Sequence, residues 1–279
     1  MNLIYMYIAV AIIGLIIGSF LMVVIDRYPK ILQQQWQAEC REYLGLKSQA
    51  ESMPFSLALP RSHCPHCKKP LKFYHNIPLF SYLWLRGKCA SCKRHISLLY
   101  PGIELLSCIL SILVVWAFGP TWQMLGCLLF TYVLITLAFI DLNHQILPDI
   151  ITISILWIGL IFNTFHLFTS LGNAVWGAVV GYLILWLSAW IFLHLRHKQG
   201  MGHGDFKMIA MVGAWFGINV MFNTLLLAIV VGAILSIILL LGRRWSWQRP
   251  LPFGPFIAAA AWITMLTGPF IIQYLRMSN

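Results

Sequence analysis

Charged residues are scarce in this chain, and acidic residues are the scarcest. Of its 279 residues, 10% are Asp, Glu, Lys or Arg, and Asp and Glu together number only 8. A soluble domain is about 25% charged and about 45–50% apolar, whereas 60% of this chain is hydrophobic. A water-soluble fold of this size could not cover its surface with so few charges. The composition therefore predicts an integral membrane protein with several spans.

The first apolar segment is not expected to be a cleavable signal peptide. No basic residue precedes the first apolar segment, and its cations, Arg27 and Lys30, follow that segment. This charge order predicts an uncleaved anchor whose N-terminus lies outside the cytoplasm.

Long uncharged runs give the number of spans. Residues 105–140, 150–195 and 208–242 contain no charged residue, and each run is too long for one helical span and about right for two. Each has a turn signal near its middle, at 119–120, 170–173 and 217–219. With single spans at 3–25 and 253–274, we predict an all-α polytopic membrane protein with about eight transmembrane helices.

The net charge of +11 is explained by topology. Eight spans place both termini on one side, and 18 of the 19 cations then lie on the other side. By the positive-inside rule the cation-rich side is the cytoplasm. The termini are therefore predicted to be periplasmic, and the basic excess does not indicate nucleic-acid binding.

The region 26–101 is the only part that resembles a soluble domain. Its residues 31–47 predict an amphipathic helix, either near the membrane surface or simply on the domain surface. Two CxxC pairs follow, Cys64 with Cys67 and Cys89 with Cys92. This spacing is typical of a structural Zn²⁺ held by four thiolates in a reducing compartment. A redox dithiol or unliganded thiols are the alternatives.

Two of the few acids lie in short loops on the same predicted side. Asp141 ends one apolar run, and Asp205 follows the alternating glycines Gly200, Gly202 and Gly204. An acid at membrane depth is a functional-site hypothesis by default. Glycines allow positive φ and close backbone approach, so the run suggests a backbone shaped around the acid or a substrate. Asp205 could instead cap a helix that begins near Phe206.

Two carboxylates held close together tend to share one proton. One then activates water while the other protonates the leaving group, so the pair predicts an aspartyl hydrolase. Proton-coupled transport and a purely structural pair are the alternatives. Lys207 could tune the pair, meet a substrate carboxylate or anchor the helix at the interface, and Asp149 fits a helix cap.

The motifs resemble the type IV prepilin leader peptidases of the GxGD aspartyl protease group. The resemblance is carried by Gly-His-Gly-Asp at 202–205 with Lys207, by a D-x5-L-P-D segment at 141–149, by residues 14–29, 63–97 and 252–256, and by Tyr100, Pro101 and Glu104. It implies three regions: a first transmembrane helix at 1–25, a cytoplasmic zinc-bearing domain at 26–101, and a membrane-embedded protease domain of about seven helices at 102–279.

The resemblance also implies an activity. Asp141 and Asp205 would be the catalytic pair, supported by Gly202, Gly204, Lys207 and Asp149. The enzyme would remove the basic leader after a glycine from prepilins or type II secretion pseudopilins, at the cytoplasmic face of the bacterial inner membrane. Family members often also methylate the new N-terminus with S-adenosylmethionine, an activity associated with the N-terminal part, where Glu104 is a candidate.

Three positions depart from the family pattern. Met22 replaces an Asn, Leu99 replaces an Arg, and Asn143 replaces a frequent Asp. The first two lie in the N-terminal half, so they bear on methylation more than on cleavage. No glycine-rich nucleotide fingerprint follows a strand, so the composition gives methyl transfer no independent support.

Overall fold

The computed structural model of the chain describes residues 3–46, 56–64, 66–71, 77–198, 200–242 and 251–277. Regular structure in these residues is helical, with two isolated β-bridges, His63–Pro70 and Lys88–His95. The chain divides into two compact units, residues 1–115 and 116–279. The all-helical prediction is confirmed, while the three-region division at 25 and 101 stays a prediction.

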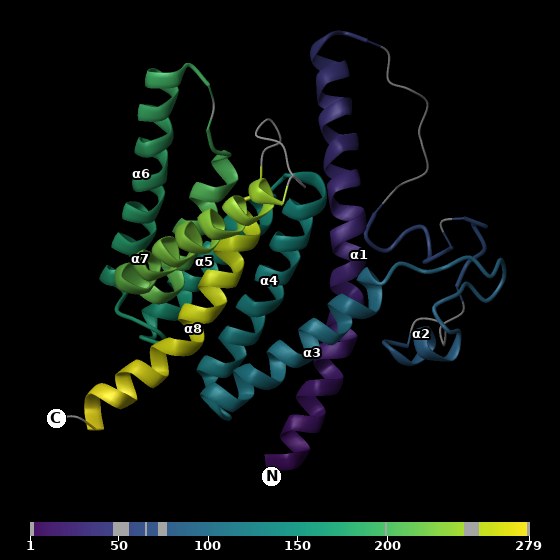
Figure 1. Cartoon of the computed structure of the whole chain (residues 1–279), viewed down its shortest axis with the longest axis horizontal. Coiled ribbons are helices and arrows are strands. Elements are labelled where there is room, and N and C mark those ends of the chain that lie inside the picture. Colours follow the sequence, from purple (N-terminus) through teal and green to yellow (C-terminus); the bar gives the residue numbers. More distant parts are fainter. Residues whose placement is uncertain are drawn as a thin grey trace. The chain divides into compact units, whose positions relative to one another are not determined.

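The first unit is built on one very long helix, α1 (Leu3–Tyr43), together with α2 (Phe80–Trp84) and most of α3 (Leu99–Phe118) (Figure 1). The 41 residues of α1 span about 62 Å at about 1.5 Å per residue, roughly twice a bilayer's hydrocarbon thickness. The helix predicted over 31–47 is thus the continuation of the first span up to Tyr43, not a separate element. Its Leu, Gln, Glu and Arg residues are good helix formers, and Pro29 lies inside the helix without ending it.

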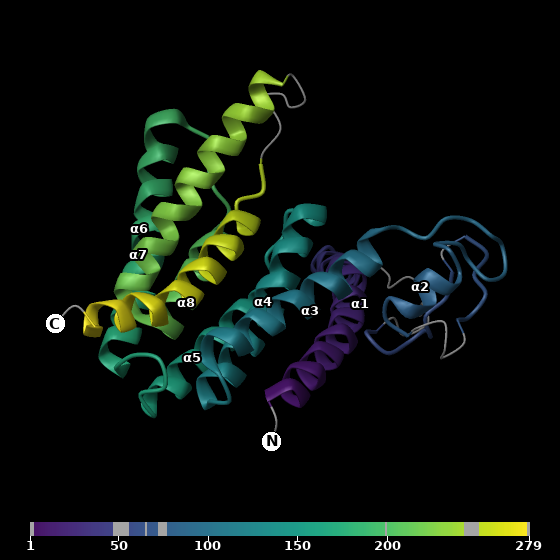
Figure 2. The same ribbon diagram turned by 60° about the horizontal axis from the view of Figure 1, so that its bottom comes forward.

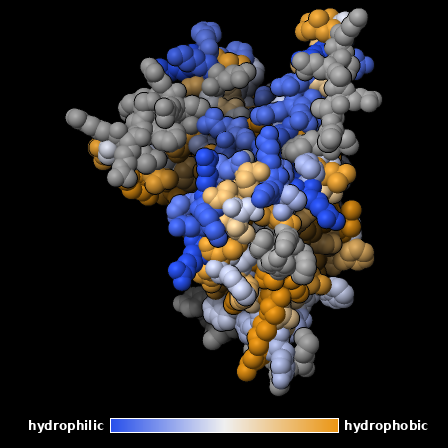
Figure 3. Space-filling model, turned by 90° about the vertical axis from the view of Figure 1, so that its right-hand side faces the viewer, coloured by the Kyte–Doolittle hydropathy of each residue, from blue (hydrophilic) through white to orange (hydrophobic). Residues whose placement is uncertain are grey.

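Hydropathy changes along this unit. Large apolar side chains are exposed on the first half of α1, among them Ile4, Ile8, Ile12 and Ile16. The second half of α1 exposes polar residues such as Gln34 and Glu39, and Figure 3 shows that hydrophilic residues gather over the upper and middle part of one face of the molecule. The first half of α1 therefore suits lipid, and its second half suits water.

Two glycines bring α1 and α3 into close contact. A Cβ at Gly18 would lie 2.8 Å from Glu104 Cα, and one at Gly14 would lie 3.0 Å from Cys108 Cα. The Ser107 hydroxyl donates to the Gly14 carbonyl at 2.6 Å. Small residues of this kind let helix backbones pack closely where lipid offers no hydrophobic driving force, and here they fix the position of Glu104.

The second unit consists of α4 (Trp122–His144), α5 (Asp149–Thr164), α6 (Leu171–Arg196), α7 (His203–Leu241) and α8 (Gly254–Met277). α6 and α7 lie side by side (Figure 2), and α7 also packs on α5 and α8. Gly177 and Gly213 meet backbone to backbone where α6 crosses α7, so neither could carry a side chain without moving the helices apart.

In the described residues, five helices are long and apolar enough to cross a membrane: α1, α3, α4, α6 and α7. The described apolar stretches of α5 and α8 are shorter, so the predicted count of eight spans is not confirmed. The turn signals at 119–120 and 170–173 do separate helices. The third signal, at 217–219, also marks a helix boundary, because α7 consists of two helices that meet across a kink at Gly217.

At this break the backbone of Gly217 leaves the helical region, with φ 82° and ψ 179°. Carbonyls freed by such a break must be satisfied inside the protein. The Asn163 side-chain amide donates to the Ala214 and Trp215 carbonyls at 2.9 and 2.8 Å. Asn173 completes the arrangement by accepting the Ile218 N–H at 3.3 Å. Buried amides from α5 and α6 therefore stabilise the kink.

An aromatic cluster ties α4, α5 and α7 together next to this kink. The fully buried Trp215 ring packs against Phe130, Phe162 and Phe168, and its indole N–H donates to the Ile155 carbonyl at 2.7 Å. Such packing is resistant to change because protein interiors are close-packed. It fixes the helices whose ends carry Asp141, Asp149 and Asp205.

Candidate functional site

Asp141 lies in the last turn of α4 and is 6% exposed. Its Oδ2 accepts a hydrogen bond from the Gly254 backbone N–H at 2.9 Å. Gly254 is the first residue of α8, so the carboxylate faces a helix N-terminus, whose partial positive charge favours an anion. The contact explains how an acid is tolerated at a helix C-terminus, where the local dipole disfavours it.

Gly254 contacts the candidate site directly, and the sequence did not single it out. A Cβ at this position would lie 2.7 Å from Asp141 Oδ2, closer than real Cβ contacts allow, so only glycine gives this approach. A signal was available: Pro255 follows directly before an apolar run, and proline is typical of helix starts. The sequence could therefore have predicted the helix start, but not which side chain it faces.

Asp205 lies in the first turn of α7 and is 8% exposed. The helix begins at His203, not near Phe206 as predicted. The Asp205 carboxylate reaches back to accept the Gly202 backbone N–H, which is the geometry of an acidic residue in a capping box. The predicted capping role is thus present, and the same contact orients the carboxylate.

The structure brings Asp141 and Asp205 together, close enough for their charges to interact. They come from the end of α4 and the start of α7, two elements far apart in the sequence. Each carboxylate accepts a hydrogen bond from a backbone N–H at the start of a helix, so each of the two buried acids lies at a helix N-terminus. Such a pair can hold one proton and one negative charge, the requirement for acid–base hydrolysis.

Of the three glycines before Asp205, Gly200 and Gly204 act by close approach, whereas a Cβ at Gly202 would meet Asp205 Oδ2 at an ordinary contact distance of 3.8 Å. None of them has positive φ, so that part of the expectation is wrong. A Cβ at Gly204 would lie 2.6 Å from Leu147 Cβ, and one at Gly200 would lie 2.6 Å from Phe192 Cδ1. Their small size lets the segment before α7 pack on the α4–α5 loop and the end of α6.

Lys207 and Asp149 form an ion pair, with Nζ 2.6 Å from Oδ1. Pro148 occupies the N-cap position of α5 and Asp149 is the first residue of the helix, so the expected cap is instead a first-turn acid paired with a cation. The two side chains are 25% and 60% exposed. The pair joins the starts of α5 and α7 beside the buried acids.

The four cysteines of the first unit form one cluster. The sulfur atoms of Cys64, Cys67, Cys89 and Cys92 all lie within 4.8 Å of one another, and Cys64 Sγ is 3.8 Å from Cys92 Sγ. Sulfurs bound at about 2.3 Å to one tetrahedral Zn²⁺ are themselves about 3.8 Å apart. The cluster can hold a metal ion, and its spacing fits zinc.

The two CxxC turns have matching geometry. The Cys64 N–H donates to the Lys69 carbonyl at 3.0 Å, and the Cys89 N–H donates to the Arg94 carbonyl at 2.8 Å. Lys68 and Lys93, each directly after the second cysteine, have positive φ. Backbone N–H groups of Cys92 and Ser91 also lower the pKa of Cys89 to about 6. This turn therefore favours the thiolate of Cys89, whereas burial and hydrogen bonds with the other cysteines raise the pKa of Cys92 to about 11.

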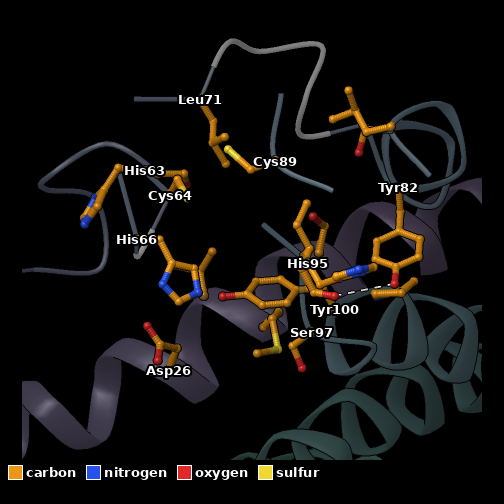
Figure 4. A pocket seen from close by; sticks show the side chains of 18 of the residues that line it. Asp26, His63, Cys64, His66, Leu71, Tyr82, Cys89, His95, Ser97 and Tyr100 are labelled. Atoms are coloured by element: carbon orange, nitrogen blue, oxygen red, sulfur yellow. Dashed lines mark hydrogen bonds between the residues drawn. The ribbon is translucent and has the colours of Figure 1, made fainter. Parts of the chain in front are cut away.

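A cavity of about 770 Å³ lies next to this cluster, bounded by α1, the CxxC turns and the start of α3 (Figure 4). Glu104 lines it and is 8% exposed. Its Oε2 accepts the Leu79 N–H at 2.9 Å, and the Ser19 side chain hydrogen-bonds to the same carboxyl group. The structure therefore places Glu104 in a cavity of the first unit, separate in sequence from Asp141 and Asp205.

Apolar helices that carry a buried pair of acids, together with a four-cysteine cluster in the first unit, fit a membrane-embedded peptidase. The chain matches the Bacterial Peptidase A24 N-terminal domain over residues 12–118 and the Type IV leader peptidase family over residues 128–237. It belongs to the type IV leader peptidase family.

Curated relatives agree over nearly the full length. The chain is 47% identical over 269 residues to a prepilin leader peptidase/N-methyltransferase of Stutzerimonas stutzeri, covering 96% of this chain and 93% of the relative. It is 43% identical over 270 residues to a protein of the same name from Legionella pneumophila, covering 97% and 94%. No solved structure matches the chain. Membership in this family, together with the apolar helices, makes the chain an inner-membrane protein.

Proposed function

We propose that this chain is a leader peptidase that cleaves prepilins and then N-methylates the new N-terminus. The catalytic groups of the cleavage step are Asp141 and Asp205, and the buried pair of carboxylates is the observation that carries this assignment. Pseudopilins of type II secretion are substrates of the same kind, because they present a basic leader before an apolar helix. The composition and family support this function over proton-coupled transport, which has no support.

The cleavage step follows from the chemistry of the pair. One carboxylate takes a proton from water, whose oxygen attacks the carbonyl carbon of the scissile peptide bond. The carboxyl group that holds the shared proton donates it to the substrate, and the C–N bond then breaks with a proton reaching the leaving amine. The proton belongs to the pair as a whole, so neither residue has a fixed role as acid or base.

The surroundings of the pair position these groups. The Gly254 N–H orients Asp141, and the Gly202 N–H orients Asp205. Gly204 lets the start of α7 pack against Leu147. The Lys207–Asp149 ion pair holds α5 and α7 in register. The Asp149 carboxylate, which is largely exposed, also offers negative charge to the basic leader.

The cleavage assignment is tested by incubating the purified protein with a prepilin and measuring the mass of the product by mass spectrometry. Wild type should release a mature chain, and Asp205→Asn should leave the prepilin intact while the protein still inserts. Glu42→Gln, an exposed acid at the end of α1, serves as the matched control and should cleave like wild type. Normal turnover by Asp205→Asn would end the proposal.

Methylation is the second activity, and the cavity beside Glu104 favours it. The donor we propose is S-adenosylmethionine, which supplies a methyl group bound to a positively charged sulfur. The metal we propose for the cysteine cluster is a structural zinc ion, held by Cys64, Cys67, Cys89 and Cys92. Mass spectrometry of the processed N-terminus tests the activity, since an unmodified amine in the presence of the donor would contradict it.

We also propose an orientation, in which both termini are periplasmic and the acid pair and the cysteine cluster face the cytoplasm. It is supported by 18 of 19 cations lying in segments assigned to one side. Labelling of single introduced cysteines from either side of the membrane tests it.

A further inference from the structure

One face of α5 exposes a row of large apolar side chains. They follow one another at spacings of three, four and four residues, so they form a single line along the helix. This α5 stripe consists of Ile150, Ile153, Trp157 and Ile161, each between 40% and 63% exposed. From first to last it extends about 17 Å at about 1.5 Å per residue, roughly half of a bilayer's hydrocarbon thickness.

The opposite face of α5 is fixed to α7. The Trp215 indole N–H donates to the Ile155 carbonyl at 2.7 Å, and the Asn163 amide donates to the Ala214 carbonyl at 2.9 Å. Gly159 faces the Trp215 ring so closely that a side chain would not fit there. These contacts hold α5 in one rotational position, in which the α5 stripe faces away from the core of the unit.

The α5 stripe begins beside the acid pair. The residue just before it, Asp149, forms the ion pair with Lys207, which lies two residues after Asp205 on α7. The loop that leads into α5 also packs on the segment before Asp205, because a Cβ at Gly204 would lie 2.6 Å from Leu147 Cβ. The α5 stripe is therefore continuous with the candidate active site.

The other helices that reach the acid pair offer a smaller apolar surface in their described side chains. α7 is buried from Met208 to Trp215, and α4 is buried or half-buried over residues 130–141. The start of α8 exposes Ala259 and Ile263, of which one is large. A long apolar partner that ends at the acid pair therefore finds its largest contact surface on α5.

The order of charge and apolarity on α5 matches that of the proposed substrate. The Asp149 side chain is 60% exposed and that of Lys207 is 25% exposed, so the negative member of the ion pair is the more accessible one. The α5 stripe follows directly after this carboxylate. A prepilin presents the complementary order, a basic leader and then an apolar helix.

We infer that the α5 stripe binds the apolar helix of the uncleaved prepilin, with Asp149 contacting a cation of the leader. The inference rests on the proposed cleavage function and adds the surface along which the substrate lies. Association of helices in a bilayer depends on side-chain packing, because lipid is as apolar as the helices themselves. Contact with lipid alone is the alternative for the same face.

Photocross-linking tests this surface. A benzophenone amino acid replaces Trp157 in the Asp205→Asn variant, which should leave the prepilin uncleaved, and the protein is illuminated with a full-length prepilin in lipid vesicles. Trp186, an exposed residue of α6, is the matched control position. A cross-link to the apolar helix of the prepilin should form from position 157 and not from position 186.

The same replacement at Ile153 gives a second position, which decides if the variant at Trp157 does not insert. Cross-links to the prepilin from positions 153 or 157 that are no stronger than those from position 186 would mean that α5 meets lipid alone, and they would overturn the inference.

Cleavage kinetics test the contact of Asp149. KM is measured for a prepilin with its basic leader and for one whose leader cations are replaced by glutamine. Wild type should show a KM about two- to fivefold lower for the basic leader, the size of an exposed ion pair. Asp149→Asn should lose this preference, whereas Lys207→Gln breaks the same ion pair but keeps the carboxylate, and should keep the preference.

Loss of the preference in both variants, or in neither, would overturn the contact of Asp149 with the leader. Failure of the inference also differs from failure of the proposed function. If wild type cleaves the prepilin while cross-links avoid the α5 stripe, the inference is wrong and the cleavage assignment stands. If wild type cleaves no prepilin, the proposed function itself is wrong.

Discussion

The two units hold their acids in different ways. In residues 116–279 the acids Asp141 and Asp205 are fixed by helix ends, with backbone N–H donors from Gly254 and Gly202. In residues 1–115 Glu104 faces a cavity whose wall contains the non-helical CxxC turns, gathered by four cysteines. The second unit therefore builds its site by helix packing, whereas the proposed zinc ion would cross-link the turns of the first unit. Changes in one unit should leave the other activity in place.

The largest effect is expected for Asp141→Asn. It removes one of the two groups that exchange protons, so cleavage should fall about 10²–10⁴-fold. Methylation of a supplied mature peptide should be unchanged, because Glu104 is not altered. The product mass after each reaction gives both rates. A variant that loses both activities would show that the two sites are not separate.

Gly254→Ala should cause the second largest loss of cleavage. The added Cβ would meet Asp141 Oδ2 and displace the N–H donor. Loss of a hydrogen bond to a charged group costs about 1.5–3 kcal/mol, so cleavage should fall roughly 10–150-fold. Gly172→Ala is the matched control, because a Cβ at Gly172 meets open space. Equal rates for the two variants would contradict the positioning role of Gly254.

Cys89→Ser tests the cross-link of the first unit. Zinc content should fall, and donor binding should weaken because the cavity wall loses its support. Cleavage should stay within about threefold of wild type, since separate units can fold on their own. Cys40→Ser, an exposed free cysteine, should change neither metal content nor donor binding. Full donor binding without bound metal would contradict this dependence.

Lys207→Gln should give the smallest effect. The ion pair with Asp149 is largely exposed on the acid side, and exposed pairs contribute about 0.2–1 kcal/mol. Cleavage should fall less than about fivefold. A double-mutant cycle with Asp149→Asn measures the coupling directly. A loss as large as that of Asp141→Asn would assign Lys207 a part in the chemistry itself.

The sequence predicted what depends on local pattern. Apolar runs gave the helices, Gly217 gave the break in α7, the CxxC spacing gave the cluster, and the scarcity of acids pointed to Asp141 and Asp205. It predicted a span at 3–25 and a separate helix at 31–47, whereas α1 runs without interruption through Pro29 to Tyr43. Composition alone gave neither the number of spans nor their boundaries.

What the sequence could not give depends on contacts between distant residues. The Gly254 N–H meets Asp141 from 113 positions away, and Asn163 satisfies carbonyls freed at the kink more than 50 positions later. The cavity is formed by three segments between residues 19 and 104. No local pattern encodes such pairings, because the backbone groups involved are present in every residue.

The central claim is that one chain carries two separate sites, and a mixing experiment tests it most directly. The variants Asp205→Asn and Glu104→Gln are purified separately and combined in detergent with a prepilin and S-adenosylmethionine. The mass of the product is then measured by mass spectrometry. Each variant alone should give either uncleaved prepilin or a cleaved, unmethylated chain. The mixture should give the cleaved and methylated chain, because each variant supplies the site that the other lacks. A mixture whose product stays unmethylated would contradict the account.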